Sequence, residues 1–130
     1  MPLGKETILE YNRIERGRMI VRQKEVIIKG PLEKAIHSIV AVSDPDRIIL
    51  FGSRARDSGN SKGDFDLFVL KKGMRDPRKV AQQIYLAFEN IGAPVDVLAE
   101  DADRFELLKE DPYLIYREIA SEGQVVYEKH

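Results

Sequence analysis

Apolar residues first recur at helical spacing between Pro31 and Ser43. They fall three or four residues apart, as on the buried side of an amphipathic helix, at Leu32, Ala35, Ile36, Ile39 and Val40. Proline suits the first turn of a helix, and the polar Asp44 followed by Pro45 suits its end. The pattern therefore predicts an amphipathic helix over residues 31–43.

A second helical pattern starts at Pro77, with Asp76 in the position of an N-cap. Its apolar positions are Val80, Ile84, Ala87, Phe88 and Ile91. Gly92 follows directly and is the residue type that commonly stops a helix. The pattern predicts a helix that begins at Pro77 and runs to Ile91.

Four short apolar runs bounded by turn residues have the length and composition of strands. They are Arg47–Phe51, Asp64–Leu70, Pro94–Leu98 and Gln124–Tyr127. Between the last two runs, residues 100–122 hold eight acidic and three basic side chains, and we expect one or two short helices there. Alternating helices and strands predict an α/β (α+β) fold in which helices pack against a single mixed β-sheet.

Residues 1–30 differ from the rest in charge, with seven basic and four acidic side chains. Ile14, Val21 and Ile28 recur every seven residues and favour a helix, although Gly17 weakens its middle by up to ~1 kcal/mol relative to Ala. The chain is therefore divided into a basic helical extension, 1–30, and a domain, 31–130. The extension is either a solvated helix laid on the domain or an arm that binds a partner.

Composition excludes several classes of protein. A chain of 130 residues with 43% apolar and 33% charged residues fits one folded domain rather than a disordered segment. The absence of Cys excludes zinc fingers, iron–sulfur sites and disulfide scaffolds. A net charge of -1 argues against nucleic acid as a partner. No apolar run is long enough to span a membrane, so we expect a cytoplasmic protein.

Three Asp residues interrupt the predicted strands, and their pattern indicates a cation-binding site. Side chains alternate along a strand, so Asp64 and Asp66 point to one face together with the apolar Phe68 and Leu70. Asp96 similarly interrupts an apolar run. Carboxylates at the edge of a core repel one another and lose hydration, and divalent cations relieve both costs. The pattern predicts a two-metal site for Mg²⁺, with Mn²⁺ as a substitute, that supports in-line displacement at phosphorus.

The segment after the first predicted strand carries groups suited to phosphate. Gly52 permits close backbone approach, and Ser53 supplies an amide and a hydroxyl. Arg54 and Arg56 follow and can counter the charge of a triphosphate. Side chains at nearby positions on a helical turn diverge, so only one of the two arginines is expected to face the site, and Arg54 is the weaker candidate.

These residues together resemble the nucleotidyltransferase superfamily related to DNA polymerase β. The resemblance rests on the segment 51–56, a spacer of ten residues, and the Asp pair 64–67, with Asp96 in the place of the third carboxylate. It extends from about Pro31 to Tyr127 and points to minimal nucleotidyltransferase domains of the antitoxin type. Asp57 and Gly63 depart from the residues often found at their positions; neither removes a metal ligand, but both would alter the loop.

The resemblance implies transfer of AMP from ATP to an acceptor, with release of pyrophosphate. Asp64 and Asp66 would bind the metals and the nucleotide, and Asp96 would complete the site and help to deprotonate the nucleophile. Gly52 and Ser53 would grip the phosphates.

The acceptor is not identified by the sequence. Larger relatives append a helical domain that binds the base or the acceptor, and we expect this surface to come from elsewhere. The resemblance implies a partner HEPN-domain toxin whose tyrosine is adenylylated by this chain as its antitoxin. Two alternatives stay open: a non-catalytic nucleotide-binding module that neutralises a partner, and a transferase acting on a small molecule or an RNA end. A homo-oligomer is also compatible with the sequence.

Overall fold

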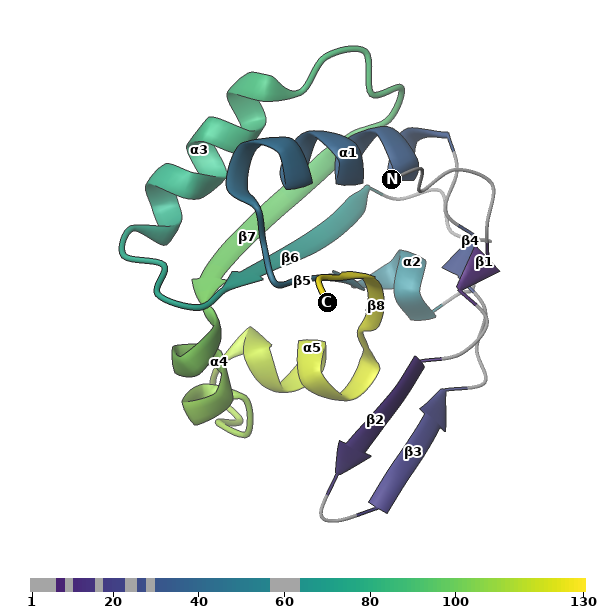
Figure 1. Cartoon of the computed structure of the whole chain (residues 1–130), viewed down its shortest axis with the longest axis vertical. Helices are drawn as coiled ribbons and strands as arrows, with labels where there is room; N and C mark the ends of the chain where they lie inside the picture. Colours follow the sequence, from purple (N-terminus) through teal and green to yellow (C-terminus); the bar gives the residue numbers. More distant parts are fainter. Residues whose placement is uncertain (1–6, 9–10, 16–17, 23–25, 28–29, 57–63) are drawn as a thin grey trace.

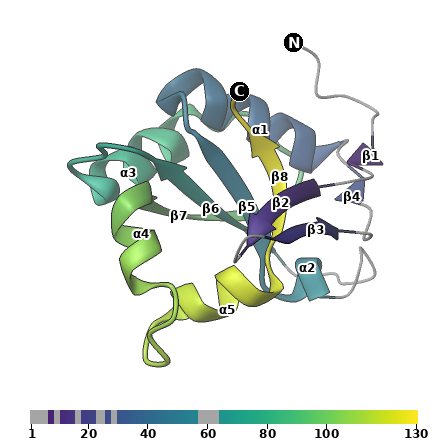
Figure 2. The same ribbon diagram turned by 60° about the horizontal axis from the view of Figure 1, so that its bottom comes forward.

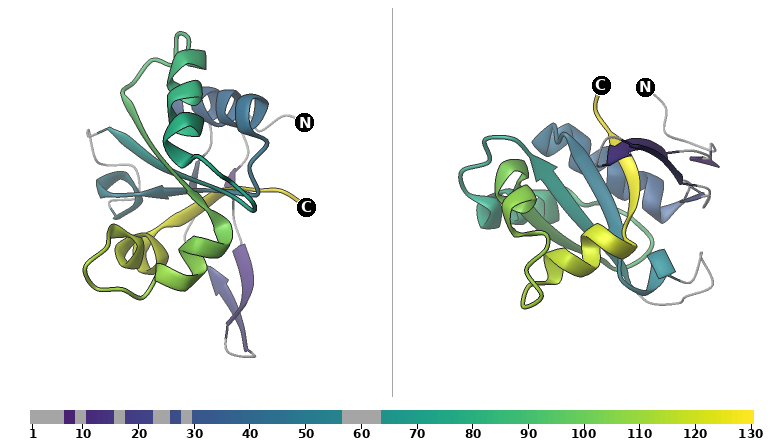
Figure 3. Two further views of the ribbon diagram at one scale, coloured as in Figure 1. Left: turned by 90° about the vertical axis from the view of Figure 1, so that its left-hand side faces the viewer. Right: turned by 90° about the horizontal axis from the view of Figure 1, so that it is seen from below.

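The computed structural model describes the chain except for residues 1–6, 9–10, 16–17, 23–25, 28–29 and 57–63. From residue 30 onward a central sheet lies between helices on both faces, as Figure 1 and the left view of Figure 3 show. In chain order these elements are α1 (Pro31–Ser43), β5 (Arg47–Phe51), α2 (Ser53–Arg56), β6 (Phe65–Lys71), α3 (Pro77–Ala87), β7 (Val95–Asp101), α4 (Ala102–Leu108), α5 (Ile115–Glu122) and β8 (Gln124–Glu128).

The central sheet has the strand order β7-β6-β5-β8. Strand β5 runs antiparallel to both of its neighbours, while β6 and β7 are parallel and are joined through α3. All four strands expected from the apolar runs are present, and β7 continues three residues beyond Leu98 to Asp101. The predicted fold class, a mixed sheet with helices packed against it, is confirmed.

The two faces of the sheet are buried by different helices. Along β6, Phe65, Leu67 and Val69 enter a core formed with α1 and α3. Phe68 and Leu70 enter a second core formed with α4 and α5. Because side chains alternate across a strand, the uninterrupted apolar run over residues 67–70 supplies both cores at once.

Helices α1 and α3 start where the sequence predicts them. Pro31 occupies the first turn of α1, and the Asp76 carboxylate caps α3 by accepting a hydrogen bond from the Lys79 amide at 3.2 Å. The predicted end of α3 is wrong, since the helix stops at Ala87 rather than Ile91. The chain must turn back into β7 there, and Asn90 adopts a φ of 52° within that turn. Ile91 kept the helical apolar pattern because it is buried in the core without being in the helix.

Helices α4 and α5 are the two short helices expected between residues 100 and 122. They pack through an aromatic cluster in which the Phe68 ring centroid lies 5.0 Å from that of Phe105 and 5.3 Å from that of Tyr116. Ile119 of α5 is also buried in this core. No helix in the described part of the chain has the length and apolar character needed to cross a membrane.

The expectation of a helix within residues 1–30 is wrong for the residues that the structure describes. They form strands: β1 (Thr7–Ile8) pairs with β4 (Val26–Ile27), and β2 (Tyr11–Glu15) pairs with β3 (Arg18–Arg22), both antiparallel. β-branched residues, which favour strands, are common in β3 and β4. Pairing between strands outweighs the recurrence of apolar residues every seven positions, which is also found in helices. The division at residue 31 and the role of the first segment stay predictions.

Candidate active site

The sheet topology brings the predicted site residues to one end of three neighbouring strands. Asp66 is opposite Phe51, the last residue of β5, and is also in register with Asp96 near the start of β7. The amide of Phe65 donates a hydrogen bond of 3.1 Å to the Pro94 carbonyl, which ties the starts of β6 and β7 together. Asp64 lies directly before β6. The three carboxylates and the Gly52-Ser53 turn thus share one end of the sheet.

Register also decides which face the carboxylates occupy. Paired residues on neighbouring strands point to the same side of a sheet. Asp66 alternates with residues of the α1/α3 core, and Leu98, two residues after Asp96, packs against the α4/α5 core. Asp66 and Asp96 therefore both lie on the α4/α5 face.

Gly52 is pressed against the Asp66 carboxylate. Its φ is 75°, in the left-handed region that favours glycine, and a Cβ built on it would collide with Asp66 Oδ2. Its carbonyl accepts hydrogen bonds from the amides of Ala55 and Arg56 at 3.1 and 3.2 Å, which starts α2. Any other residue here would be strained and would displace the carboxylate, so glycine is required both by the turn and by the site.

The electrostatic surroundings of Asp66 match the predicted crowding of negative charge. Partial burial raises the pKa of the Asp66 carboxyl, and the charges of Asp96 and Asp64 raise it further. The positive charge of the Arg56 guanidinium lowers this pKa, and the negative charge of Glu118 raises it by a smaller amount. Asp66 is thus the carboxylate whose pKa responds to the other charges of the site.

The carboxylates suit a divalent cation by their chemistry, although they are not gathered into a closed ligand set. Within the described ranges, no three His, Cys, Asp or Glu side chains are close enough to hold a metal ion together. Asp64 and Asp96 are exposed at the strand ends and Asp66 is half-buried, so their oxygens are accessible. Carboxylate oxygens are the ligands that Mg²⁺ prefers, and a cation would relieve the repulsion that raises the pKa of Asp66. Metal binding by these residues stays a prediction.

The two arginines of α2 point to different sides. The Arg54 guanidinium carbon lies 4.0 Å above the centroid of the Phe65 ring, a residue of the α1/α3 core. Arg56 Nη1 lies 3.5 Å from both Glu118 Oε2 and Glu122 Oε1 of α5. Positions two apart on a helix are separated by about 200°, which accounts for the divergence. Of the two, Arg56 is on the same face as Asp66.

Sequence reasoning did not single out Glu118 and Glu122. They are spaced four residues apart on a helix and so project from one face, but Glu106 and Glu110 of the same acidic tail have this spacing too. Only the packing of α5 beside α2, seen in Figure 2, distinguishes these two.

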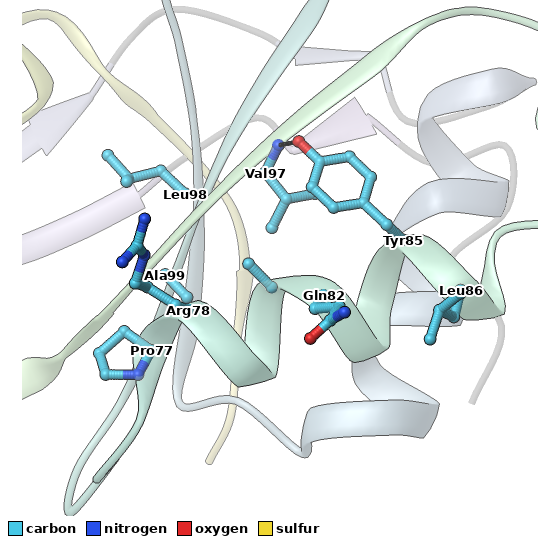
Figure 4. A pocket seen from close by; sticks show the side chains of 9 residues that line it. Pro77, Arg78, Gln82, Tyr85, Leu86, Val97, Leu98 and Ala99 are labelled. Atoms are coloured by element: carbon cyan, nitrogen blue, oxygen red, sulfur yellow. Dashed lines mark hydrogen bonds between the residues drawn. The ribbon is translucent and has the colours of Figure 1, made fainter.

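A groove of about 410 Å³ lies elsewhere, between α3 and the outer edge of β7. Figure 4 shows Tyr85 spanning it, and the Tyr85 hydroxyl accepts a hydrogen bond of 2.6 Å from the Val97 amide. The groove is lined by Pro77, Arg78, Ala81, Gln82, Tyr85, Leu86, Val97, Leu98 and Ala99. None of the three carboxylates lines it, so it is separate from the candidate site.

Comparison with known proteins identifies the family to which the chain belongs. Among solved structures, the chain is similar to a crystal structure of a mutant of the toxin–antitoxin MntA–HpeT, with 16% identity, a TM-score of 0.47, and coverage of 75% of this chain and 74% of that one. It is also similar to a crystal structure of a toxin–antitoxin with AMP-PNP, with 18% identity and the same TM-score and coverage. The search of curated proteins found no match. Residues 33–130, well over half of the chain, match the model of the family described as polymerase beta, nucleotidyltransferase, and the chain therefore belongs to this family of nucleotidyltransferases.

Proposed function

We propose that this nucleotidyltransferase is metal-dependent and transfers AMP from ATP to a tyrosine of a partner HEPN toxin, for which it is the antitoxin. The observation that carries the catalytic part is that Asp64, Asp66 and Asp96 lie at the same end of β6 and β7, with Gly52, at the end of β5, in contact with Asp66. Such an arrangement costs stability in the free protein, and its use is to receive cations and phosphate.

Each site residue has a task that its position allows. Asp64 and Asp66 would hold two Mg²⁺ or Mn²⁺ ions, which would neutralise the triphosphate charge and lower the barrier to attack. Asp96, whose carboxylate is exposed, would take the proton from the acceptor hydroxyl. The Gly52-Ser53 turn would hold the phosphates, with Arg56 and, less directly, Arg54 as countercharges.

The overall reaction balances without a further reactant. The acceptor oxygen forms a bond to the α-phosphorus of ATP, and the bond from that phosphorus to the bridging oxygen of the β-phosphate breaks. The acceptor proton passes to Asp96 and then to solvent, and pyrophosphate leaves. Transfer to a tyrosine hydroxyl produces a stable phosphodiester.

A protein partner is supported by the surface around α4 and α5. Leu107 and Tyr113 are 85% and 93% exposed, and Ile115 is 48% exposed. Contiguous apolar patches on a surface are common features of protein-binding sites, and these three side chains all fall between residues 107 and 115 of the chain. A cytoplasmic location, where ATP and such a partner would be present, is part of the same proposal.

The test is transfer of radiolabelled AMP from ATP to a co-purified HEPN protein in the presence of Mg²⁺ or Mn²⁺. We expect the double variant Asp64→Asn/Asp66→Asn to lose labelling. Asp44→Asn is the matched control, because Asp44 pairs with Lys129 on the far side of the fold. Undiminished labelling in the double variant would refute the assignment of these residues.

Nucleotide binding distinguishes the alternatives. Calorimetry of ATP with and without a chelator should show binding only when the divalent cation is present. Equal affinity in both conditions would favour the non-catalytic module, and labelling of an RNA end or a small molecule instead of the protein would favour the other transferase.

A further inference from the structure

Helix α5 presents two acidic side chains to one arginine of the site. Glu118 and Glu122 are four residues apart on the same face of α5, and one oxygen of each lies 3.5 Å from Arg56 Nη1. Figure 2 shows α2 next to the C-terminal end of α5. The contact joins residues more than sixty positions apart in the chain.

The position of α5 is fixed by its packing. Ile119, between the two acidic residues, is 1% exposed, and the Tyr116 ring lies against Phe68 and Phe105. At the end of the helix, a Cβ on Gly123 would lie only 2.5 Å from both the Ile119 carbonyl oxygen and Ile49 Cγ2. The backbone that carries Glu118 and Glu122 is therefore held rigidly against β5.

The same charges reach the catalytic carboxylates. Arg56 lowers the pKa of Asp66 and Glu118 raises it, so both charges lie within reach of that carboxylate. The ion-paired group is thus part of the surroundings of Asp66 rather than a remote surface contact.

These ion pairs are weak enough to position Arg56 without blocking its access to a triphosphate. At 3.5 Å the pairs are longer than the 2.7–2.9 Å typical of charge-assisted hydrogen bonds, and all three side chains are between 44% and 49% exposed. Such exposed pairs contribute little attraction, so a triphosphate would displace or share them at small cost. They nevertheless restrict a long side chain whose rotamer freedom opposes binding.

We propose that Glu118 and Glu122 are positioning residues, which hold the Arg56 guanidinium on the Asp66 side of the site before the triphosphate arrives. This inference rests on the proposed function. It assigns to α5 a part in nucleotide binding that the Asp and Gly-Ser motifs do not contain.

The experiment is a double-mutant cycle read out by calorimetric affinity for MgATP. Glu118→Gln/Glu122→Gln should weaken binding about 3- to 10-fold, because Arg56 must then be ordered on binding, and should raise KM for ATP more than it lowers kcat. In an Arg56→Ala background the same two substitutions should have no further effect. The control is Glu128→Gln, which removes a comparable ion pair to Arg47 at the other end of β5, with a separation of 2.9 Å.

The outcomes separate this inference from the proposed function. Unchanged affinity in the Glu118→Gln/Glu122→Gln variant, with only a lower melting temperature, would show that the pairs are structural and would overturn the inference. Tighter binding would show that the acids compete with phosphate and would also overturn it. A wild-type chain that binds no MgATP would overturn the proposed function itself.

Discussion

Substitution of Gly52 by Ala tests the contact on which the site depends. The added Cβ meets two obstacles: a φ of 75° and the Asp66 carboxylate oxygen. Left-handed backbone costs a non-glycine residue about 1–2 kcal/mol. The collision adds less than this, because the end of a carboxylate side chain can rotate away, but the rotation moves the group that we propose binds the cation.

Gly73 provides the matched control. Its φ is 81°, and a Cβ there would have no neighbour within 4 Å. Gly73→Ala should therefore show the backbone cost alone, about 1–2 kcal/mol, at the opposite end of β6. The two variants are expected to differ in stability by at most ~1–2 kcal/mol, within the range for mild overpacking.

The assays are urea denaturation for the free energy of unfolding and metal-dependent ATP binding together with AMP transfer. Both variants should be destabilised, and only Gly52→Ala should lose binding and transfer, by 10-fold or more, on the order of what misplacing a catalytic group costs. Activity of Gly52→Ala equal to that of Gly73→Ala would refute the reasoning that Gly52 positions Asp66.

Two further predictions concern groups whose pKa is perturbed. Asp66→Asn should stabilise the fold at neutral pH. A raised carboxyl pKa favours the folded state below about pH 3.8, and this advantage is lost as pH rises through the pKa that Asp66 has in the folded state. Denaturation midpoints at pH 7 and pH 3 check this, and a variant less stable than the wild type at pH 7 would contradict it. Burial, followed by the hydrogen bond to Glu100 at 2.6 Å, raises the pKa of the Tyr116 hydroxyl, so stability present below about pH 10 should fall above it. Tyr116→Phe should cost about 1–3 kcal/mol at neutral pH, because it removes one of the hydrogen-bond partners of the buried Glu100, which keeps Arg104 and the Asp101 amide. It should also flatten the alkaline loss of stability; an unchanged slope above pH 10 would show that Tyr116 is not responsible.

Much of the fold follows from short-range signals in the chain. The apolar period and caps of α1 and α3 and the turn-bounded runs of β5 to β8 depend on neighbouring residues, so they are visible in the sequence. The Asp pair and the Gly-Ser turn were recognisable for the same reason, because each belongs to one strand or turn. Their common place at one end of the sheet was expected, and the register of Asp66 with both Phe51 and Asp96 agrees with it.

Other features depended on contacts between distant segments. The described residues before Gly30 form paired strands because partners across a ladder, rather than a period of seven, determine their conformation. The end of α3 at Ala87 was set by the turn into β7, and the selection of Glu118 and Glu122 among the tail acids was set by the packing of α5 beside α2. Local sequence thus determined which groups are candidates for the chemistry, and tertiary packing decided which other charges face them, because electrostatic neighbours arise from folding and not from spacing.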